Sequence, residues 1–213
     1  MLGDYLLGSD ATLRLPSAAH SLRIEGDFDA ALADNARYDL ALAELRMIGL
    51  GQGQSLEVMS ADIGPDPSGL DRDLPGRYPV GTLRIGPAPT VVNLLDNHDN
   101  DNQGQASPEA IYVDLLVIDQ GATLNTGPFR VYYRTLVLAG DVDDPSRLVQ
   151  ITSPCPGDLT GDGQVDLTDL SILLAHFGTL SGAEPDDGDL DGDGDVDLTD
   201  LSLMLGGFGL SCD

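Results

Sequence analysis

The chain of 213 residues ends in two near-copies of a 22-residue segment, and this duplication constrains its fold more than any other feature. The copies read GDLTGDGQVDLTDLSILLAHFG at residues 157–178 and GDLDGDGDVDLTDLSLMLGGFG at residues 188–209, and they are identical at 16 of 22 positions. Each copy opens with an acidic loop of twelve residues and continues into an apolar stretch. Carboxylates occupy loop positions 1, 5, 9 and 12 around a glycine at position 6, an arrangement that suits a cation held by oxygen ligands.

This spacing is that of an EF-hand loop, and it predicts one calcium ion in each copy. The first loop has a threonine at position 3, so it carries one negative charge fewer than the second and should bind its ion more weakly. Calcium fits six to eight oxygen ligands better than magnesium does. The alternative is a solvated linker rich in Asp and Gly. The predicted ligands are Asp158, Thr160, Asp162, Gln164, Asp166 and Asp169 in the first loop and Asp189, Asp191, Asp193, Asp195, Asp197 and Asp200 in the second.

A short helix is expected after each loop. Asp166 and Asp169 suit the N-cap and the third position of such a helix, so they can serve the helix and the ion together. A glycine follows each apolar stretch where a C-terminal cap belongs. The apolar residues at helical spacing are Leu167, Leu170, Leu173, Leu174 and Phe177 in the first copy and Leu198, Leu201, Leu205 and Phe208 in the second.

A loop followed by an exiting helix, duplicated about thirty residues apart, resembles the dockerin type I module, which has two such F-hand repeats. The resemblance covers about 57 of the 213 residues. It implies docking onto a cohesin domain, with partner choice set at loop positions 10 and 11. These positions are Leu167 and Thr168 in the first copy and Leu198 and Thr199 in the second, so either repeat can in principle face a partner. The same residues also suit packing at a helix N-terminus.

The charge distribution excludes one class of partner. The net charge is −26, all ten basic residues are arginine, and none lies beyond Arg147. An acidic surface of this kind repels nucleic-acid phosphates. The helices that follow the loops also lack the Lys and Arg that cellulosomal dockerins usually carry, which leaves the partner open between a cohesin-like domain and copies of the chain itself. No apolar stretch is long enough to insert into a membrane.

Length and cysteine positions suggest two domains, at residues 1–152 and 153–213. Cys155 and Cys212 bracket the repeats, and a disulfide between them would stabilise a loop of about 57 residues by roughly 4 kcal/mol. The alternative is two unrelated buried thiols. Disulfides persist outside the cell, so we expect an extracellular or cell-surface protein. The first ten residues lack the pattern of a secretory signal, which leaves open whether the chain is part of a longer precursor.

Residues 1–152 contain short apolar alternations typical of β-strands, separated by Gly, Pro, Asn and Asp. Four of them place a leucine and an arginine on opposite faces, at Leu13, Leu22, Leu45 and Leu83. Residues 117–142 resemble the rungs of a parallel β-helix. We therefore expect a mainly β domain with a parallel β-helix (solenoid) fold, with a β-sandwich as the alternative, followed by a small all-α, dockerin-like domain. Only residues 30–43 could form a helix in the first domain.

The segment DNHDNDNQGQ at residues 96–105 is a candidate for a third ion. It places Asp99, Asp101, Gln103 and Gly104 at the spacing of loop positions 1, 3, 5 and 6, but Ala110 stands at position 12. Otherwise it forms a polar turn.

Catalytic motifs are missing from the sequence. The three histidines, His20, His98 and His176, lie in unrelated contexts, and no nucleophile elbow or HExxH motif is found. Arg130 and Arg134 support only a minor alternative, a polysaccharide-active enzyme. We expect a non-catalytic protein whose repeats bind two calcium ions and mediate structural packing, including oligomers or fibres, or attachment to a protein. A second interpretation is a cohesin-binding adaptor that carries a β-rich passenger.

Overall fold

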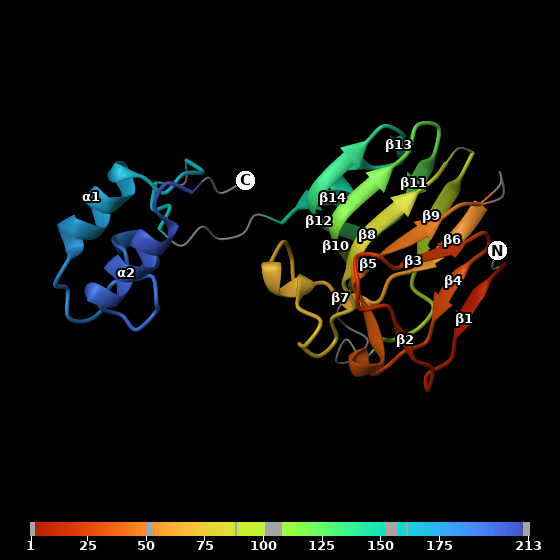
Figure 1. Cartoon of the computed structure of the whole chain (residues 1–213), viewed down its shortest axis with the longest axis horizontal. Coiled ribbons are helices and arrows are strands. Elements are labelled where there is room, and N and C mark those ends of the chain that lie inside the picture. The colour runs from red at the N-terminus through yellow and green to blue at the C-terminus, as the bar shows by residue number, and fades with distance from the viewer. Residues whose placement is uncertain are drawn as a thin grey trace. The chain divides into compact units, whose positions relative to one another are not determined.

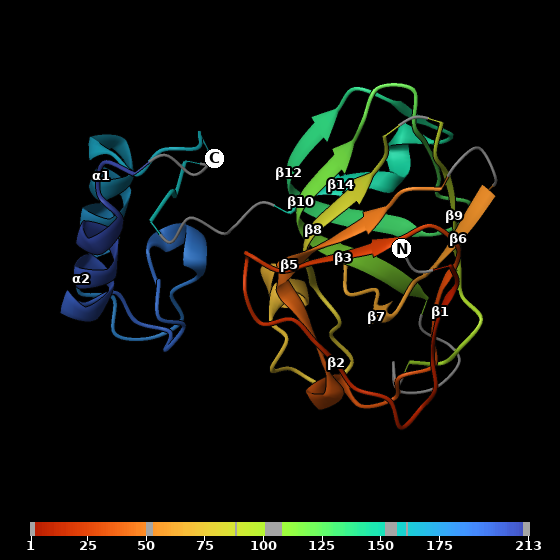
Figure 2. The same ribbon diagram turned by 45° about the vertical axis from the view of Figure 1, so that its right-hand side comes forward.

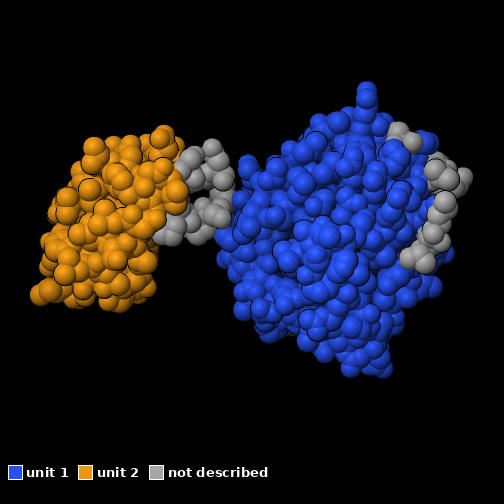
Figure 3. All heavy atoms as spheres, viewed as in Figure 1, with its two compact units in different colours: residues 1–151 blue, residues 152–213 orange. Residues whose placement is uncertain are grey.

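The structure is a computed structural model that describes residues 3–49, 53–87, 89–100, 108–151, 157–160 and 162–210. The chain divides into two compact units, Met1–Ile151 and Thr152–Asp213, called unit 1 and unit 2 below (Figure 3). Unit 1 contains the β-strands, and unit 2 contains both α-helices of the described residues.

Two sheets of mainly parallel strands make up unit 1 (Figures 1 and 2). The larger has the order β14-β12-β10-β8-β5-β2, with β3 also paired to β5 and β7 to β10. The smaller has the order β1-β4-β6-β9-β11-β13. The strands are β1 Tyr5–Leu7, β2 Leu13–Arg14, β3 Ser21–Ile24, β4 Phe28–Ala30, β5 Tyr38–Met47, β6 Gly53–Glu57, β7 Ser60–Ala61, β8 Val80–Ile85, β9 Val91–Leu95, β10 Glu109–Ile118, β11 Thr123–Asn125, β12 Arg130–Leu138, β13 Asp141–Val142 and β14 Leu148–Gln150.

The leucines of the repeated Leu-Arg signature lie in register across neighbouring strands of the larger sheet. Leu22 aligns with Leu45, and Leu45 aligns with Leu83, on neighbouring parallel strands. All three leucines are buried, whereas the arginines that follow them point to the opposite face, as alternation along a strand requires. On that face Arg84 forms an ion pair with Asp119 at 2.8 Å.

The main core of unit 1 draws apolar side chains from strands of both sheets, for example Ile24 and Leu83 from the larger and Phe28 and Leu94 from the smaller. The sheets therefore bury one face each against a shared interior. A second, smaller cluster contains the stacked rings of Tyr112 and Tyr132.

The fold class expected from the sequence is wrong as stated, although a β-rich first unit is observed. A β-sandwich needs antiparallel sheets, whereas every strand pair among the described residues is parallel except β7 with β10. A parallel β-helix was expected from short strands in similar rungs. The strands instead vary from two to ten residues, and β2 and β3 both pair with β5. The finding is two mainly parallel sheets.

Two further details concern helices. The regular elements of the described part of unit 2 are helices, but α1 and α2 have only ten residues each and loops make up most of the remainder. In unit 1, residues 30–43 contain only the short 3-10 helix η1 Asn35–Arg37, after which the chain enters β5. Leu40 lies in the core, and burial alternates along β5 from Ala43 onward, after a register shift in the pairing with β8 between Leu40 and Glu44. This alanine-rich stretch therefore forms a strand.

Unit 2 contains α1 Leu167–His176, the 3-10 helix η4 Pro185–Asp187 and α2 Leu198–Gly207. Its core consists of Val165, Leu173, Val196 and Met204. Unit 1 contains two more 3-10 helices, η2 Pro67–Leu70 and η3 Pro145–Arg147. None of the helices described is long and apolar enough to cross a membrane.

Candidate metal centre

Each acidic loop of unit 2 turns at a glycine. The backbone conformation of this glycine is one that only a residue without a side chain adopts easily. Gly163 and Gly194, at position 6 of the two loops, have φ angles of 85° and 87°. In both loops the carboxylate at position 1 accepts the N–H of this glycine. Asp158 Oδ2 accepts from Gly163 and Asp189 Oδ2 accepts from Gly194, each at 2.9 Å. The loops therefore curl around their first carboxylate.

The last carboxylate of each loop is built into the following helix. Asp166 and Asp169 form a capping box at the start of α1, and Asp197 and Asp200 do the same at the start of α2. Asp169 and Asp200 are fully buried, and each also accepts an N–H from position 3 of its own loop. The sequence predicted that such a carboxylate serves both the helix and the ion. The geometry allows this, because one side chain joins the loop to the helix.

The acidic loops at residues 158–169 and 189–200 are called loop 1 and loop 2. Loop 2 gathers its carboxylates into two groups. The oxygens of Asp189, Asp191 and Asp193 lie within 4.8 Å of one another, and so do those of Asp195, Asp197 and Asp200. Asp195 Oδ1 is buried and has no hydrogen-bond partner. Clustered carboxylates with an unpaired buried oxygen make a donor set of hard oxygens, which fits calcium.

Loop 1 has a smaller acidic donor set. Thr160 takes position 3, where its hydroxyl donates to Asp158 Oδ1 at 3.3 Å. Among the described residues, the groups of three acidic side chains whose oxygens meet within 4.8 Å lie in loop 2. The missing carboxylate agrees with the expectation that loop 1 is the weaker site.

The surroundings of the loop 2 carboxylates shift their pKa values in opposite directions. Burial alone raises the pKa of Asp200, but the N–H groups of Asp197 and Leu190 outweigh it and keep the pKa below its usual range. Burial and the neighbouring charge of Asp193 raise the pKa of Asp195. The backbone therefore favours the ionised form of Asp200, whereas the ionised form of Asp195 would be stabilised by a nearby cation.

The two loops are joined by reciprocal main-chain hydrogen bonds. Val196, at position 8 of loop 2, accepts from Gly178 at 2.8 Å, just after α1. Val165, at position 8 of loop 1, accepts from Gly209 at 2.8 Å, just after α2. Because each loop is fastened to the end of the other repeat's helix, ordering one loop should help to order the other.

The positions expected to meet a partner are exposed. Leu167 is 72% exposed and Leu198 is 71% exposed, and Thr168 and Thr199 beside them are exposed as well. These leucines are therefore not packed inside unit 2. The helical spacing predicted Leu174 on the apolar face of α1, but that side chain is 52% exposed. Leu174 lies seven residues after Leu167, and residues at this spacing lie on one side of an α-helix. This spacing is the sequence signal from which a shared exposed surface could have been predicted.

Several other residues singled out in the sequence fall elsewhere. Cys155, Cys212 and residues 101–107, which include Asp101, Gln103 and Gly104, lie outside the described residues, so the disulfide and that part of the third candidate loop are not described. The histidines are not brought together, since His98 Nε2 binds Asp29 at 2.7 Å in unit 1 and His176 contacts Asp187 in unit 2.

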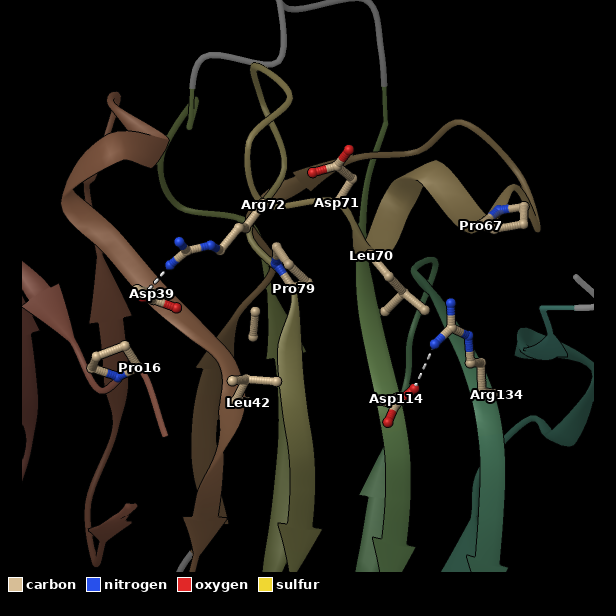
Figure 4. Close-up of a pocket in the computed structure, with 11 residues that line it drawn as sticks. Pro16, Asp39, Leu42, Pro67, Leu70, Asp71, Arg72, Pro79, Asp114 and Arg134 are labelled. Atoms are coloured by element: carbon tan, nitrogen blue, oxygen red, sulfur yellow. Dashed lines mark hydrogen bonds and ion pairs between the residues drawn. The ribbon is translucent and has the colours of Figure 1, made fainter. Parts of the chain in front are cut away.

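The arginines of the enzyme alternative lie on β12. Arg134 pairs with Asp114 of β10 at 3.1 Å and lines an open groove of about 510 Å³ on unit 1, where Arg72 pairs with the buried Asp39 (Figure 4). Arg130 donates to the Tyr132 hydroxyl. Both arginines in the groove face carboxylates, and the described groove lining contains no His, Ser or Cys side chain. Both arginines of the groove are thus paired, and Asp71 adds a further carboxylate to its lining.

Comparison with known proteins agrees with the architecture of unit 2. Residues 156–205 match the family model of the dockerin type I domain. A domain of this family implies calcium binding and attachment to another protein through a cohesin domain. No curated protein and no solved structure matched the chain.

Proposed function

We propose that unit 2 is a calcium-dependent docking module that attaches the β-rich unit 1 to a cohesin-like domain of another protein, outside the cell or at its surface. Loops 1 and 2 hold one calcium ion each, through the twelve residues named above. The ions neutralise part of the acidic charge and order the loops, and the loops in turn fix the starts of α1 and α2.

The observation that carries this proposal is an apolar surface repeated on both helices. Leu167 and Leu174 of α1 are 72% and 52% exposed, and Leu198 and Leu205 of α2 are 71% and 55% exposed. Each pair is seven residues apart and so lies on one side of its helix. Exposed leucines gathered in a domain of this size are typical of a protein-binding surface.

Charge narrows the class of partner. Residues 157–213 carry fourteen Asp and Glu residues and no Lys or Arg. A complementary partner presents an apolar centre with a basic or neutral rim, because opposite charges at the rim favour association. Two copies of unit 2 would instead bring like charges together, so attachment to a different protein is favoured over fibres formed through unit 2.

Unit 1 is proposed to be the non-catalytic passenger. The open groove on its larger sheet has its arginines paired with carboxylates. Its histidines occupy separate places, with His98 bound to Asp29. Neither arrangement provides a nucleophile beside a base.

The test is binding of the purified full chain to a panel of cohesin domains, measured by calorimetry in calcium and in EDTA. We expect binding in calcium that is lost in EDTA. Because both repeats carry the same Leu-Thr pair, replacing one pair by aspartates (L167D/T168D or L198D/T199D) should weaken binding by about tenfold or less, and replacing both should abolish it.

The matched control is Leu6→Asp, which changes a leucine that is 71% exposed in β1 of unit 1. This variant should bind like the parent chain. Binding that persists in EDTA, or that the Leu6→Asp variant loses to the same extent, would contradict the proposal. Oligomers that form in calcium without any cohesin would favour self-association instead.

A further inference from the structure

Unit 1 buries two glutamates close to the acidic segment that follows β9. Glu57, the last residue of β6, is 3% exposed, and Glu109, the first residue of β10, is 1% exposed. Asn100 lies between them in the chain and is completely buried. Carboxylates are almost never buried this far unless they are paired.

Both carboxylates bind the same short stretch of backbone. Glu57 Oε1 accepts the N–H groups of Asn97 and His98, each at 2.8 Å. Glu109 Oε1 accepts the N–H of Asn100 at 3.1 Å. The two side chains therefore converge on residues 97–100 from different strands.

Two oxygens in this place have no partner. Glu57 Oε2 and Asn100 Oδ1 are buried and make no hydrogen bond. The Asn100 amide is fixed in orientation, since its Nδ2 donates to the carbonyls of Ala30 and Leu32 at 2.8 Å each. That orientation leaves Oδ1 on the side of the amide away from these carbonyls. Buried oxygens without partners are rare and costly, so their presence where two buried glutamates bind the same stretch of backbone points to a missing ligand.

The two glutamates also lie in surroundings that disfavour their charged forms. Burial raises the pKa of Glu57 to about 7 and the pKa of Glu109 to about 8, and the two carboxylates repel each other. Burial, with the charge of Asp99, also raises the pKa of Asp96. The His98 side chain beside this segment is bound to Asp29. A ligand that meets two carboxylates and an amide oxygen is favoured when it is positive.

We propose that Glu57, Asn100 and Glu109 hold a divalent cation of the calcium class in unit 1. The donors are two carboxylates and one amide oxygen, all of the hard type that calcium takes, and water can supply further ligands. This set differs from loop 2, where the carboxylates form two groups of three. The ion would tie the segment after β9 to the ends of β6 and β10. It is separate from the two ions of unit 2.

The tyrosines offer a spectroscopic test that sees unit 1 selectively. All six tyrosines lie in residues 1–151, and the chain has no tryptophan. The Tyr78 hydroxyl donates to the carbonyl of Leu32, the same oxygen that accepts from Asn100. A terbium ion bound beside Asn100 therefore has a tyrosine close enough to sensitise its emission.

The experiment uses the full chain in an Asp158→Asn/Asp189→Asn background, which disables the first ligand of both loops in unit 2. We expect about one calcium ion per chain to remain after equilibrium dialysis, and terbium to show tyrosine-sensitised emission that excess calcium removes. Adding Glu57→Gln and Glu109→Gln, which keep side-chain size, should abolish both signals. Glu44→Gln, in strand β5, is the matched control and should leave both unchanged.

Absence of bound calcium and of terbium emission in the Asp158→Asn/Asp189→Asn background would overturn the proposal and show that protons alone neutralise these glutamates. That result would not affect the docking function, because the cohesin measurement depends on unit 2. If the variant with both glutamines does not fold, the terbium measurement in the background chain still decides the question.

Discussion

The carboxylate of Asp200 offers the sharpest single-residue test of how unit 2 is built. It is fully buried and accepts N–H groups from Leu190 at 2.8 Å, Asp191 at 3.3 Å and Asp197 at 2.7 Å. Asp200→Asn preserves the shape but replaces one acceptor oxygen by an NH2 group. One or more of these N–H groups then faces a donor instead of an acceptor.

The expected cost follows from the bonds lost. A missing cap bond at the start of a helix costs about 1 kcal/mol, and a buried N–H left without an acceptor costs about 1–3 kcal/mol. Asp200→Asn should therefore lower the free energy of unfolding of unit 2 by about 2–4 kcal/mol even in EDTA. In calcium the loss should be larger, because a charged ligand is removed as well.

The assay is urea unfolding of the full chain followed by circular dichroism at the helix band, since both α-helices of the described residues lie in unit 2. Asp191→Asn is the matched control. Asp191 is exposed and accepts the N–H of Asp193, so in EDTA the change should fall within about 0.5 kcal/mol of the parent. Equal stability of the two variants in EDTA would refute this account of Asp200.

Three further predictions concern single features. Thr160→Asp restores a carboxylate at position 3 of loop 1 and should tighten calcium binding there by about tenfold, or ~1.4 kcal/mol, in a calorimetric titration; unchanged affinity would argue against ligation at that position. In EDTA, the stability of unit 1 should fall as the pH rises from 4.5 to 8. This follows because the folded-state pKa values of Glu57 and Glu109, about 7 and about 8, exceed the ordinary 4.5, so the native state binds more protons across that range. Urea unfolding at the two pH values should show a smaller fall for the Glu57→Gln/Glu109→Gln variant. Gly69→Ala puts a methyl group into the ring of Tyr112 and should cost about 1–3 kcal/mol, seen as a lower melting temperature; an unchanged one would contradict that packing.

The sequence was sufficient for the local features of unit 2. Ligand spacing within twelve residues, the N-cap and third-position carboxylates and the glycine after each helix are local signals, and the capping boxes at Asp166 and Asp197 are present. The helix of the first repeat was expected from the leucine spacing, and α1 spans Leu167–His176. What the spacing could not supply is which leucines remain exposed, because that depends on where the other repeat packs.

Unit 1 shows the opposite case. The Leu-Arg alternation correctly indicated strands with one buried face, and Leu45 is 2% exposed. The partner of each strand, however, is decided by contacts between distant segments, and parallel pairing such as Leu45 with Leu83 leaves no local mark in the sequence. The site at Glu57 and Glu109 could not be predicted for the same reason. These residues are 52 positions apart in the sequence, and they are brought together because both bind residues 97–100.

Amide hydrogen exchange of the full chain with and without calcium tests most directly whether calcium binds the two acidic loops of unit 2 and orders them. We predict that the amides of Gly163 and Gly194, which donate to the first carboxylate of each loop, exchange at least about tenfold more slowly in calcium than in EDTA. The strands β5 and β8 of unit 1 serve as the internal reference and should change little. Equal exchange rates at both glycines in calcium and in EDTA would contradict the claim.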